Sequence, residues 1–160
     1  MRVRKTIEKD LLDYYGLVND DLVRFVSFRT STVNLKEHTT WFENSLANKN
    51  RIMYVLEGAV SGTEFLGQVR FDKVLSTTFD NTFELDYSIA SSQRGKGLGK
   101  KMLLLGLKML TESFKNPCVI AKVKLDNFAS AKVLLKVGFL WQNKIKDMNV
   151  YIINYGSKQA

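Results

Sequence analysis

The spacing of hydrophobic and polar residues along this chain predicts alternating groups of strands and helices. Segment 83–89 carries hydrophobic side chains at every second position, with Glu84, Asp86 and Ser88 between them, as in a strand with one buried face. After it, hydrophobic residues recur every three to four positions, which predicts a long amphipathic helix from Leu98 onward. The same two patterns predict strands over 2–6, 52–56, 65–74, 119–124, 139–142 and 149–154, and helices over 11–18, from 34 onward and ending at 137.

Several of these predicted strands follow one another without a helix between them. Strands joined directly by turns form antiparallel pairs, whereas a regular alternation of strand and helix forms a parallel sheet. The length of 160 residues suits a single domain spanning 1–160, and a hydrophobic content of 45% is enough for one core. We therefore expect an α/β (α+β) fold with a mixed, mostly antiparallel sheet.

Charge is distributed unevenly along the chain. Residues 1–90 carry 11 Lys and Arg against 13 Asp and Glu, whereas residues 91–160 carry 13 against 3. Such a surplus of positive charge predicts an anionic partner, which could be nucleic acid, a phosphorylated cofactor or a nucleotide-linked substrate. The composition does not choose among the three.

Membrane, secreted and cysteine-based metal proteins are not expected. No hydrophobic run approaches the ~20 residues of a membrane helix, and the N-terminus lacks the apolar segment of a signal peptide. The single cysteine, Cys118, cannot form an internal disulfide or a cysteine metal cluster. We expect a cytoplasmic protein with no membrane partner and no metal.

A glycine-rich segment joins the 83–89 strand to the long helix. Gly95, Gly97 and Gly99 let the backbone come close to a ligand, and N–H groups at a helix N-terminus bind phosphate. The segment is not a P-loop, because no Lys-Ser/Thr pair ends it, and it lacks the acidic residue of a dinucleotide fold. It predicts a phosphate site, with a tight turn between solvated lysines as the alternative. The cationic residues beside it are Arg94, Lys96, Lys100 and Lys101.

Two motifs in the second half of the chain resemble the GNAT superfamily of N-acetyltransferases. They are Arg94-Gly95-Lys96-Gly97-Leu98-Gly99 and, about thirty residues later, Asn127-Phe128-Ala129-Ser130 with Lys136-Val137-Gly138-Phe139. The resemblance implies a single-domain GNAT fold with helices on both faces of a sheet that is split by a V-shaped cleft, between the strands 83–89 and 119–124. It implies acetyl-CoA as cofactor, with its pantetheine arm hydrogen-bonded to the first of these strands. The cofactor-binding residues that it implies are Tyr87, Ser88, Ile89, Arg94, Gly95, Lys96, Gly97, Leu98, Gly99, Lys100, Asn127, Ser130 and Lys136. For Asn127, a plain helix cap is an equal alternative. For Ser130 and Lys136 the alternatives are a small helix residue and a solvated lysine.

Acetyl transfer to an amine requires a base for the amine proton and benefits from an acid for the leaving thiolate. Many members of the family have a tyrosine four residues after the serine as the acid, and this chain has Leu134 there. Tyr151 is a candidate substitute for this acid. Without any acid, release of CoA as the free thiolate at pH 7 costs only about 2 kcal/mol for a thiol pKa near 8.5. Candidate bases are Glu84 and Asp86, with surface carboxylates as the alternative, and His38, which is the only histidine.

A weaker resemblance in the first half concerns the acceptor. Asn19-Asp20, Val23-Arg24 and Leu35-x-x-His38-x-x-Trp41-Phe42 are similar to the branch that acetylates nucleotide-linked deoxy-sugars on the way to nonulosonic acids such as pseudaminic acid. The same region is also similar to the N-terminal acetyltransferases of ribosomal proteins. Candidate substrate-binding residues are His38, Trp41, Phe42 and Phe71, and core packing is the alternative for at least two of them.

The excess positive charge favours an acceptor that carries a diphosphate. We therefore expect direct attack, in a ternary complex, by the 4-amino group of a UDP-linked amino-deoxy-sugar on acetyl-CoA. A small-molecule amine is the expected partner, and homodimer formation is left open. A non-catalytic nucleic-acid-binding module remains the other alternative, although the sequence lacks a recognition-helix signature.

Overall fold

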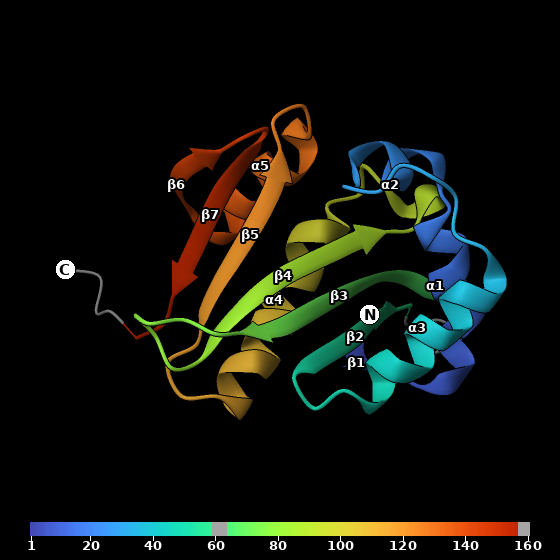
Figure 1. Cartoon of the computed structure of the whole chain (residues 1–160), viewed down its shortest axis with the longest axis horizontal. Helices are drawn as coiled ribbons and strands as arrows, with labels where there is room; N and C mark the ends of the chain where they lie inside the picture. The colour runs from blue at the N-terminus through green and yellow to red at the C-terminus, as the bar shows by residue number, and fades with distance from the viewer. Residues whose placement is uncertain (59–63, 157–160) are drawn as a thin grey trace.

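A single seven-stranded sheet organises the chain in the computed structural model, which describes residues 1–58 and 64–156. The strand order is β1-β2-β3-β4-β5-β7-β6, so each strand lies beside the next one in sequence except β5 and β6, which β7 separates (Figure 1). The strands are β1 (Arg2–Lys5), β2 (Arg51–Glu57), β3 (Phe65–Val74), β4 (Thr82–Ile89), β5 (Cys118–Lys124), β6 (Leu140–Ile145) and β7 (Met148–Asn154). The helices are α1 (Leu11–Val18), α2 (Asp21–Val26), α3 (Leu35–Ala47), α4 (Leu98–Ser113) and α5 (Phe128–Val137), with short 3-10 turns η1 (Glu8–Asp10) and η2 (Ser91–Gln93).

The sheet is split between β4 and β5, as the resemblance implies. These two strands are parallel, whereas all other neighbours are antiparallel. Their pairing runs only from Thr82 with Cys118 to Leu85 with Ala121. Beyond that point 86–89 pairs only with β3 and 122–124 pairs only with β7, and the strands diverge (Figure 1). The expected mixed, mostly antiparallel α/β fold with a V-shaped split is confirmed.

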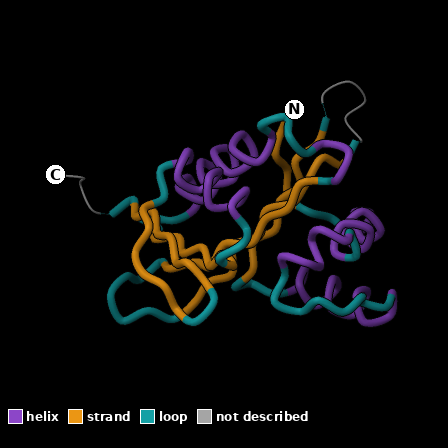
Figure 2. The backbone as a smooth tube through the Cα atoms, turned by 90° about the horizontal axis from the view of Figure 1, so that it is seen from above, coloured by secondary structure: helices purple, strands orange, loops and turns teal. Residues whose placement is uncertain are grey.

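Helices cover both faces of the sheet. Alternate residues of β2 show this: Tyr54 and Leu56 belong to the core under α4, whereas Met53 and Val55 pack with α1 and α3 in a second cluster. Figure 2 shows the strands between these two groups of helices. The period of two in β2 therefore gives one hydrophobic face to each layer.

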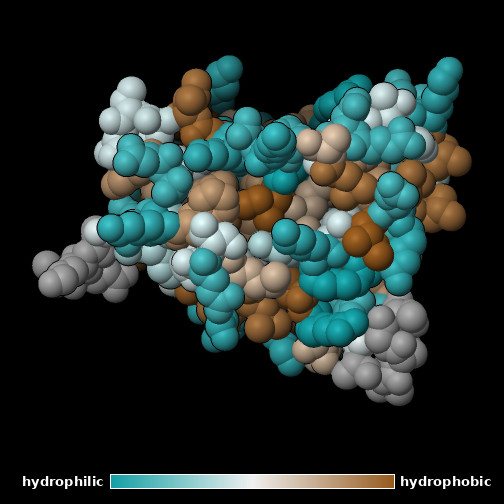
Figure 3. Space-filling view, turned by 90° about the horizontal axis from the view of Figure 1, so that it is seen from below, coloured by the Kyte–Doolittle hydropathy of each residue, from teal (hydrophilic) through white to brown (hydrophobic). Residues whose placement is uncertain are grey.

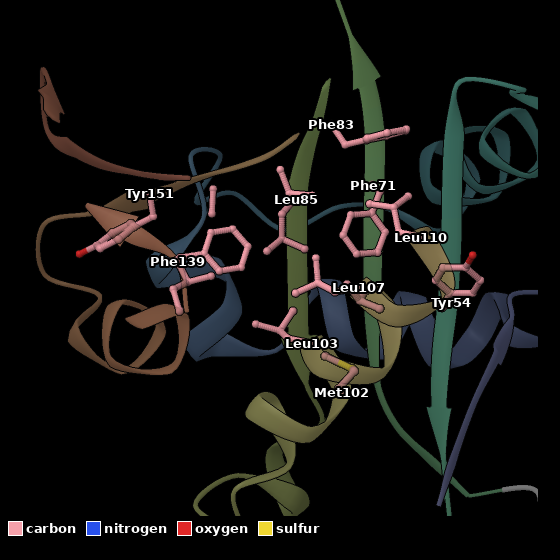
Figure 4. Close-up of a cluster of buried hydrophobic side chains, with 14 of the residues drawn as sticks. Tyr54, Phe71, Phe83, Leu85, Met102, Leu103, Leu107, Leu110, Phe139 and Tyr151 are labelled. Atoms are coloured by element: carbon pink, nitrogen blue, oxygen red, sulfur yellow. The ribbon is translucent and has the colours of Figure 1, made fainter. Parts of the chain in front are cut away.

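The larger core lies between α4 and the middle of the sheet (Figure 4). Gly106 of α4 permits close helix packing, because a Cβ there would lie 3.0 Å from Cγ1 of Val69 on β3. Phe71 and Phe139 have no more than 1% of their surface exposed in this core. Complete burial of such side chains stabilises the fold by roughly 1.5–3 kcal/mol each.

Helix α2 is the element that the sequence pattern did not predict. It has only six residues, which is too few for a hydrophobic period to stand out, and none of them is buried. The Asp20 side chain caps it by accepting a hydrogen bond from the Val23 N–H.

No helix in the described ranges is long and apolar enough to cross a bilayer. On the face seen from below, apolar side chains form patches among hydrophilic ones (Figure 3).

Candidate active site

A cleft of about 570 Å³ opens where β4 and β5 diverge. Its walls come from α1, α2 with the loop that follows it, α3, the middle of β3, the ends of β4 and β5, and the first turn of α5. The volume lies within the usual range of small-molecule sites. Segments far apart in the sequence therefore meet at the open end of the V.

The glycine-rich loop lies between the end of β4 and α4. Gly95 and Gly97 have φ values of 75° and 74°, and a Cβ built on either would meet no atom within 4 Å. Gly97 is the N-cap of α4 without a side-chain hydrogen bond. The N–H groups of Leu98, Gly99 and Lys100 make no backbone hydrogen bond within the described part of the chain. A row of free donors at the positive end of a helix dipole can bind an anion.

The cationic side chains of this loop have different surroundings. Lys96 is exposed, and its Nζ donates to Oε1 of Gln93 at 3.0 Å. Arg94 is held more firmly, because its Nε donates to the carbonyl of Ile89 at 3.1 Å and its NH2 donates to Oδ1 of Asp20 at 2.6 Å. Arg94 therefore links the end of β4 to the beginning of α2.

The other expected cofactor contacts lie on both sides of the V. Tyr87 and Ser88 line the cleft from β4, and Asn127 and Ser130 line it from α5. The Asn127 side chain accepts a hydrogen bond from the Ser130 N–H, so it is a helix cap whatever else it contacts. Burial raises the pKa of Tyr87 to about 12, and its hydroxyl lies 3.5 Å from the Ser130 carbonyl. Lys136 is exposed in the last turn of α5 and does not line the cleft.

Comparison with known families decides the class of this protein. The model of the acetyltransferase (GNAT) domain matches residues 1–140. The chain belongs to the GNAT family. It is an acetyl-CoA-dependent N-acetyltransferase.

Solved structures agree with this GNAT fold. Spermidine N-acetyltransferase from Vibrio cholerae, solved with CoA and spermine, matches with a TM-score of 0.83 at 16% identity, over 96% of this chain and 94% of that one. An aminoglycoside acetyltransferase in complex with coenzyme A gives 0.80 at 18% identity, over 96% and 94%. Ribosomal-protein-alanine N-acetyltransferase from Brucella melitensis gives 0.75 at 21%, over 95% and 97%. No curated protein sequence matches the chain. At these identities the likeness shows the fold, and the three acceptors differ.

The two carboxylates of β4 have different environments in this GNAT enzyme. Asp86 lines the cleft, and its Oδ2 accepts a hydrogen bond of 2.9 Å from Nε2 of Gln68, with NH1 of Arg70 at 3.9 Å. Glu84 does not line the cleft, and its Oε2 is paired with Nζ of Lys122 at 2.7 Å. The alternation of β4 placed both on one face, but only Asp86 reaches the open end of the V.

His38 is buried and still borders the cleft. Only 2% of its surface is exposed, and its Nε2 has no partner within the described residues. Burial lowers its pKa below the ordinary value, and a hydrogen bond with the Leu11 backbone opposes that shift. The imidazole is therefore neutral at pH 7. Its ring packs between Tyr15 and Trp41, with ring centroids 5.4 and 5.5 Å away.

Of the three aromatic candidates for substrate contact, only Trp41 reaches the cleft. Its ring lies 5.6 Å from the guanidinium carbons of both Arg51 and Arg70. Phe42 and Phe71 are wrong as substrate contacts, because each has 0% exposed surface. Phe42 packs on Tyr14 in the smaller cluster, and Phe71 lies in the main core (Figure 4).

Neither candidate position for the acid offers a hydroxyl to the cleft. Leu134 is fully buried in the main core. Tyr151 is 4% exposed, does not line the cleft, and its hydroxyl points away from the labelled core side chains (Figure 4). The expected role of Tyr151 as general acid is therefore corrected: its β7 position pairs it with Ala121, and the ring fills the core.

Most of the charged side chains of the cleft were not among the candidate site residues, although Arg24 belongs to the Val23-Arg24 motif. Five cationic side chains line it against two carboxylates, Glu37 and Asp86. The five are Arg24, Arg29, Arg70, Lys122 and Lys124. Gln68 was also missed; it is 6% exposed, and its Oε1 has no partner within the described residues. The excess of Lys and Arg after residue 91 was a signal for the two lysines, but the arginines and Gln68 lie in the acidic first half.

Proposed function

We propose that this GNAT enzyme acetylates the 4-amino group of a UDP-linked amino-deoxy-sugar by direct attack in a ternary complex. The observation that carries the proposal is the charge of the acceptor cleft. Lys122 is paired with Glu84 and Arg70 lies beside Asp72 and Asp86, but Arg24, Arg29 and Lys124 form no ion pair with a carboxylate in the described ranges. Three uncompensated cations favour an acceptor that brings its own negative charge.

This charge disfavours the acceptors of two structural neighbours. Polyamines and aminoglycosides carry several positive charges, so an excess of cations in the cleft would repel them. The pKa of Arg24 also shows the excess of positive charge. Burial, and then the nearby charge of Arg29, lower this pKa from its ordinary value. Its Nε is buried without a partner in the described part of the chain. A diphosphate would compensate these charges and accept hydrogen bonds from them.

The cofactor occupies the other wall of the V in this proposal. The pyrophosphate of acetyl-CoA binds the N–H groups of the loop from Gly95 to Lys100, whose geometry leaves space beside Gly95 and Gly97. The pantetheine arm lies along 86–89, where β4 has no partner on the β5 side. A backbone N–H of this edge stabilises the developing oxyanion of the thioester carbonyl.

Asp86 takes the amine proton, directly or through a water molecule, because it is the β4 carboxylate that borders the cleft. Gln68 fixes its orientation, and neutral His38 accepts a hydrogen bond from the acceptor through Nε2. The amine nitrogen bonds to the carbonyl carbon, the carbon–sulfur bond breaks, and the thiolate of CoA leaves. Departure without a general acid costs only about 2 kcal/mol for a thiol pKa near 8.5, which fits the position of Leu134.

The test is acetyl-CoA consumption with a matched set of acceptors. A UDP-linked 4-amino-4,6-dideoxy-hexose should have a kcat/KM at least about a hundredfold above that of the free sugar, since a lost charge partner costs several kcal/mol. The ratio should fall as salt rises. The Lys124→Met variant should have a lower kcat/KM for the UDP-linked sugar, while its kcat/KM for the free sugar should change little. Equal rates on both sugars, or rapid acetylation of a ribosomal-type N-terminal peptide with neither sugar used, would overturn the proposed acceptor.

Two further expectations accompany this function. A location in the cytoplasm fits the single buried, free Cys118. A homodimer is supported by β6, the outermost strand, which exposes Leu140, Trp141 and Ile145 on an edge that can pair with another chain. Light scattering at several protein concentrations checks the oligomeric state.

Retention of nucleic acid with steep salt dependence and no acetyl-CoA turnover would favour the binding-module alternative instead.

A further inference from the structure

Helix α2 is attached to the rest of the protein chiefly through its two ends. None of its six residues is buried, so hydrophobic packing does little to fix it. At its N-terminus Asp20 pairs with Arg94 of the glycine-rich loop. At its C-terminus the carbonyl of Phe25 accepts a hydrogen bond of 3.1 Å from Nζ of Lys124 on β5. The helix therefore bridges the open end of the V, from the loop on one side to β5 on the other (Figure 1).

At the N-terminus of α2, the Asp20 carboxylate both caps the helix and pairs with Arg94. Its Oδ1 accepts a hydrogen bond from Val23 N–H at 3.1 Å and from NH2 of Arg94 at 2.6 Å. Burial alone would raise the pKa of Asp20, but the Arg94 and Val23 hydrogen bonds outweigh it and lower the pKa. The side chains of Asp20 and Arg94 are 19% and 29% exposed, so the pair is partly shielded from water. Such a pair is stronger than a fully exposed one.

Arg94 in turn is held at two points, by Asp20 and by the carbonyl of Ile89. It lies immediately before the loop Gly95 to Gly99, so the backbone that meets the cofactor phosphate is continuous with it. Arg94 therefore connects this loop directly to the first turn of α2.

Helix α2 also forms part of the side of the cleft that we assign to the acceptor, which we call the acceptor wall. Arg24 lines the cleft, and its NH1 donates to the carbonyls of Arg29 and Ser31 at 2.9 and 3.2 Å. Through these bonds it holds the loop after α2, which contributes Phe28 and Arg29 to the same wall. A more rigid α2 therefore means a more rigid acceptor wall.

We propose that Asp20 is a positioning residue that couples the two halves of the active site. Binding of acetyl-CoA orders the loop, the Asp20–Arg94 pair passes this order to α2, and the acceptor wall becomes fixed only when the cofactor is bound. The inference rests on the proposed role of the loop in holding the pyrophosphate. By linkage, an acceptor that fixes α2 strengthens cofactor binding by the same factor.

The test is hydrogen exchange of the whole enzyme with CoA as the probe, so no acceptor is needed. In the wild type, saturating CoA should slow exchange of the amides in 21–26 by about fivefold or more, the lower end of typical coupling. Asp20→Asn should abolish this CoA-dependent slowing. Asparagine caps helices as well as aspartate does, so the variant removes the ion pair and keeps the cap. Asp21→Asn is the matched control, because it removes an exposed charge one residue later and should behave like the wild type.

A second variant tests the same link from its other end. Arg94→Gln, studied at saturating CoA, should also lose the slowing in 21–26 while the amides of 98–103 remain protected by CoA. Equal slowing in the wild type and Asp20→Asn, or no effect of CoA on α2 in the wild type, would overturn the coupling. Failure of the loop assignment would be recognised separately, because CoA would then leave 95–100 unprotected in every variant.

Discussion

The proposed cofactor wall and the proposed acceptor wall of this GNAT enzyme are built in different ways. In the proposed function the cofactor pyrophosphate meets backbone groups of one continuous segment, residues 94–100, at the start of α4. The acceptor wall uses side chains from α1, α2, α3, β3, β4 and β5, which meet only in the folded protein. A site made of backbone on a contiguous segment imposes glycines at fixed spacing. A site made of distant side chains imposes no local pattern, so the two walls should respond differently to mutation.

The largest effect is expected at the cofactor wall. Gly97→Asp should weaken acetyl-CoA binding by at least about a hundredfold, or about 2.7 kcal/mol. The carboxylate would stand beside the N–H groups of Leu98 and Gly99 and compete with the pyrophosphate. Calorimetric titration of acetyl-CoA measures the loss.

Gly97→Asn is the control for this change. Asparagine tolerates the φ of 74° about as well as aspartate and has nearly the same size, so it separates charge from shape. Gly97→Asn should bind acetyl-CoA clearly better than Gly97→Asp. A folded Gly97→Asp enzyme with unchanged affinity would remove the phosphate from this loop.

The second effect concerns the two carboxylates of β4. Asp86→Asn should lower kcat about a hundredfold, the usual scale of proton transfer by a positioned base, and leave acetyl-CoA affinity unchanged. Glu84→Gln should lower kcat by no more than about threefold, because Glu84 is paired with Lys122 and lies outside the cleft. If Glu84→Gln proved the more damaging of the two, Asp86 would not be the base.

A smaller effect is expected at Trp41. Removal of its ring in Trp41→Ala should raise the acceptor KM about fivefold to tenfold, because the ring borders the cleft and lies over Arg70, and such cation–π contacts contribute about 1 kcal/mol. Acetyl-CoA affinity should be unchanged. Trp41→Phe keeps an aromatic face and should recover most of the loss, whereas a KM that does not respond to either variant would exclude Trp41 from the acceptor site.

The smallest effect is the contribution of His38 to stability. Burial lowers its pKa in the folded state, so as the pH falls below about 6.5 the unfolded chain binds a proton that the native chain resists. The free energy of unfolding should therefore fall with pH from 6.5 down to the folded pKa, by at most about 1.4 kcal/mol per pH unit. Above 6.5 this contribution is constant.

His38→Gln should remove this slope in urea unfolding measured at several pH values between about 5 and 7.5. No other histidine complicates the comparison, because His38 is the only one in the chain. An identical slope in the variant and the wild type would show that His38 is protonated with equal ease in both states.

The fold could be predicted from the sequence wherever one period dominates. Segment 83–89 and the helix after Gly97 became β4 and α4, because each buries one regular face in the main core. Helix α2 could not be predicted in the same way. It buries no residue, and a cap with two contacts at its ends leaves no periodic trace.

The same distinction applies to the candidate site, where some residues are marked by a local sequence pattern and others are not. The glycines of the segment 95–99 stand out in the sequence, and Gly95 and Gly97 adopt φ values near 75° that favour glycine; their contact with the cofactor stays a prediction. Phe42 and Phe71 were misassigned, since an aromatic side chain at a helix or strand position has the same spacing whether it meets a ligand or the core. Glu84 and Asp86 could not be distinguished, because the point at which β4 leaves β5 depends on a strand that comes thirty residues later.

The free edge of β4 leads us to expect that the lifetime of this protein depends on acetyl-CoA. Residues 86–89 have no strand beside them on the β5 side, so this stretch of β4 is an unpaired sheet edge beside the cleft. A ligand that completes this edge stabilises the fold by mass action, by about 2.7 kcal/mol at a concentration one hundred times its Kd. Degradation follows the small fraction of molecules that are open at any moment. We therefore expect the enzyme to resist proteolysis better with saturating acetyl-CoA than without it.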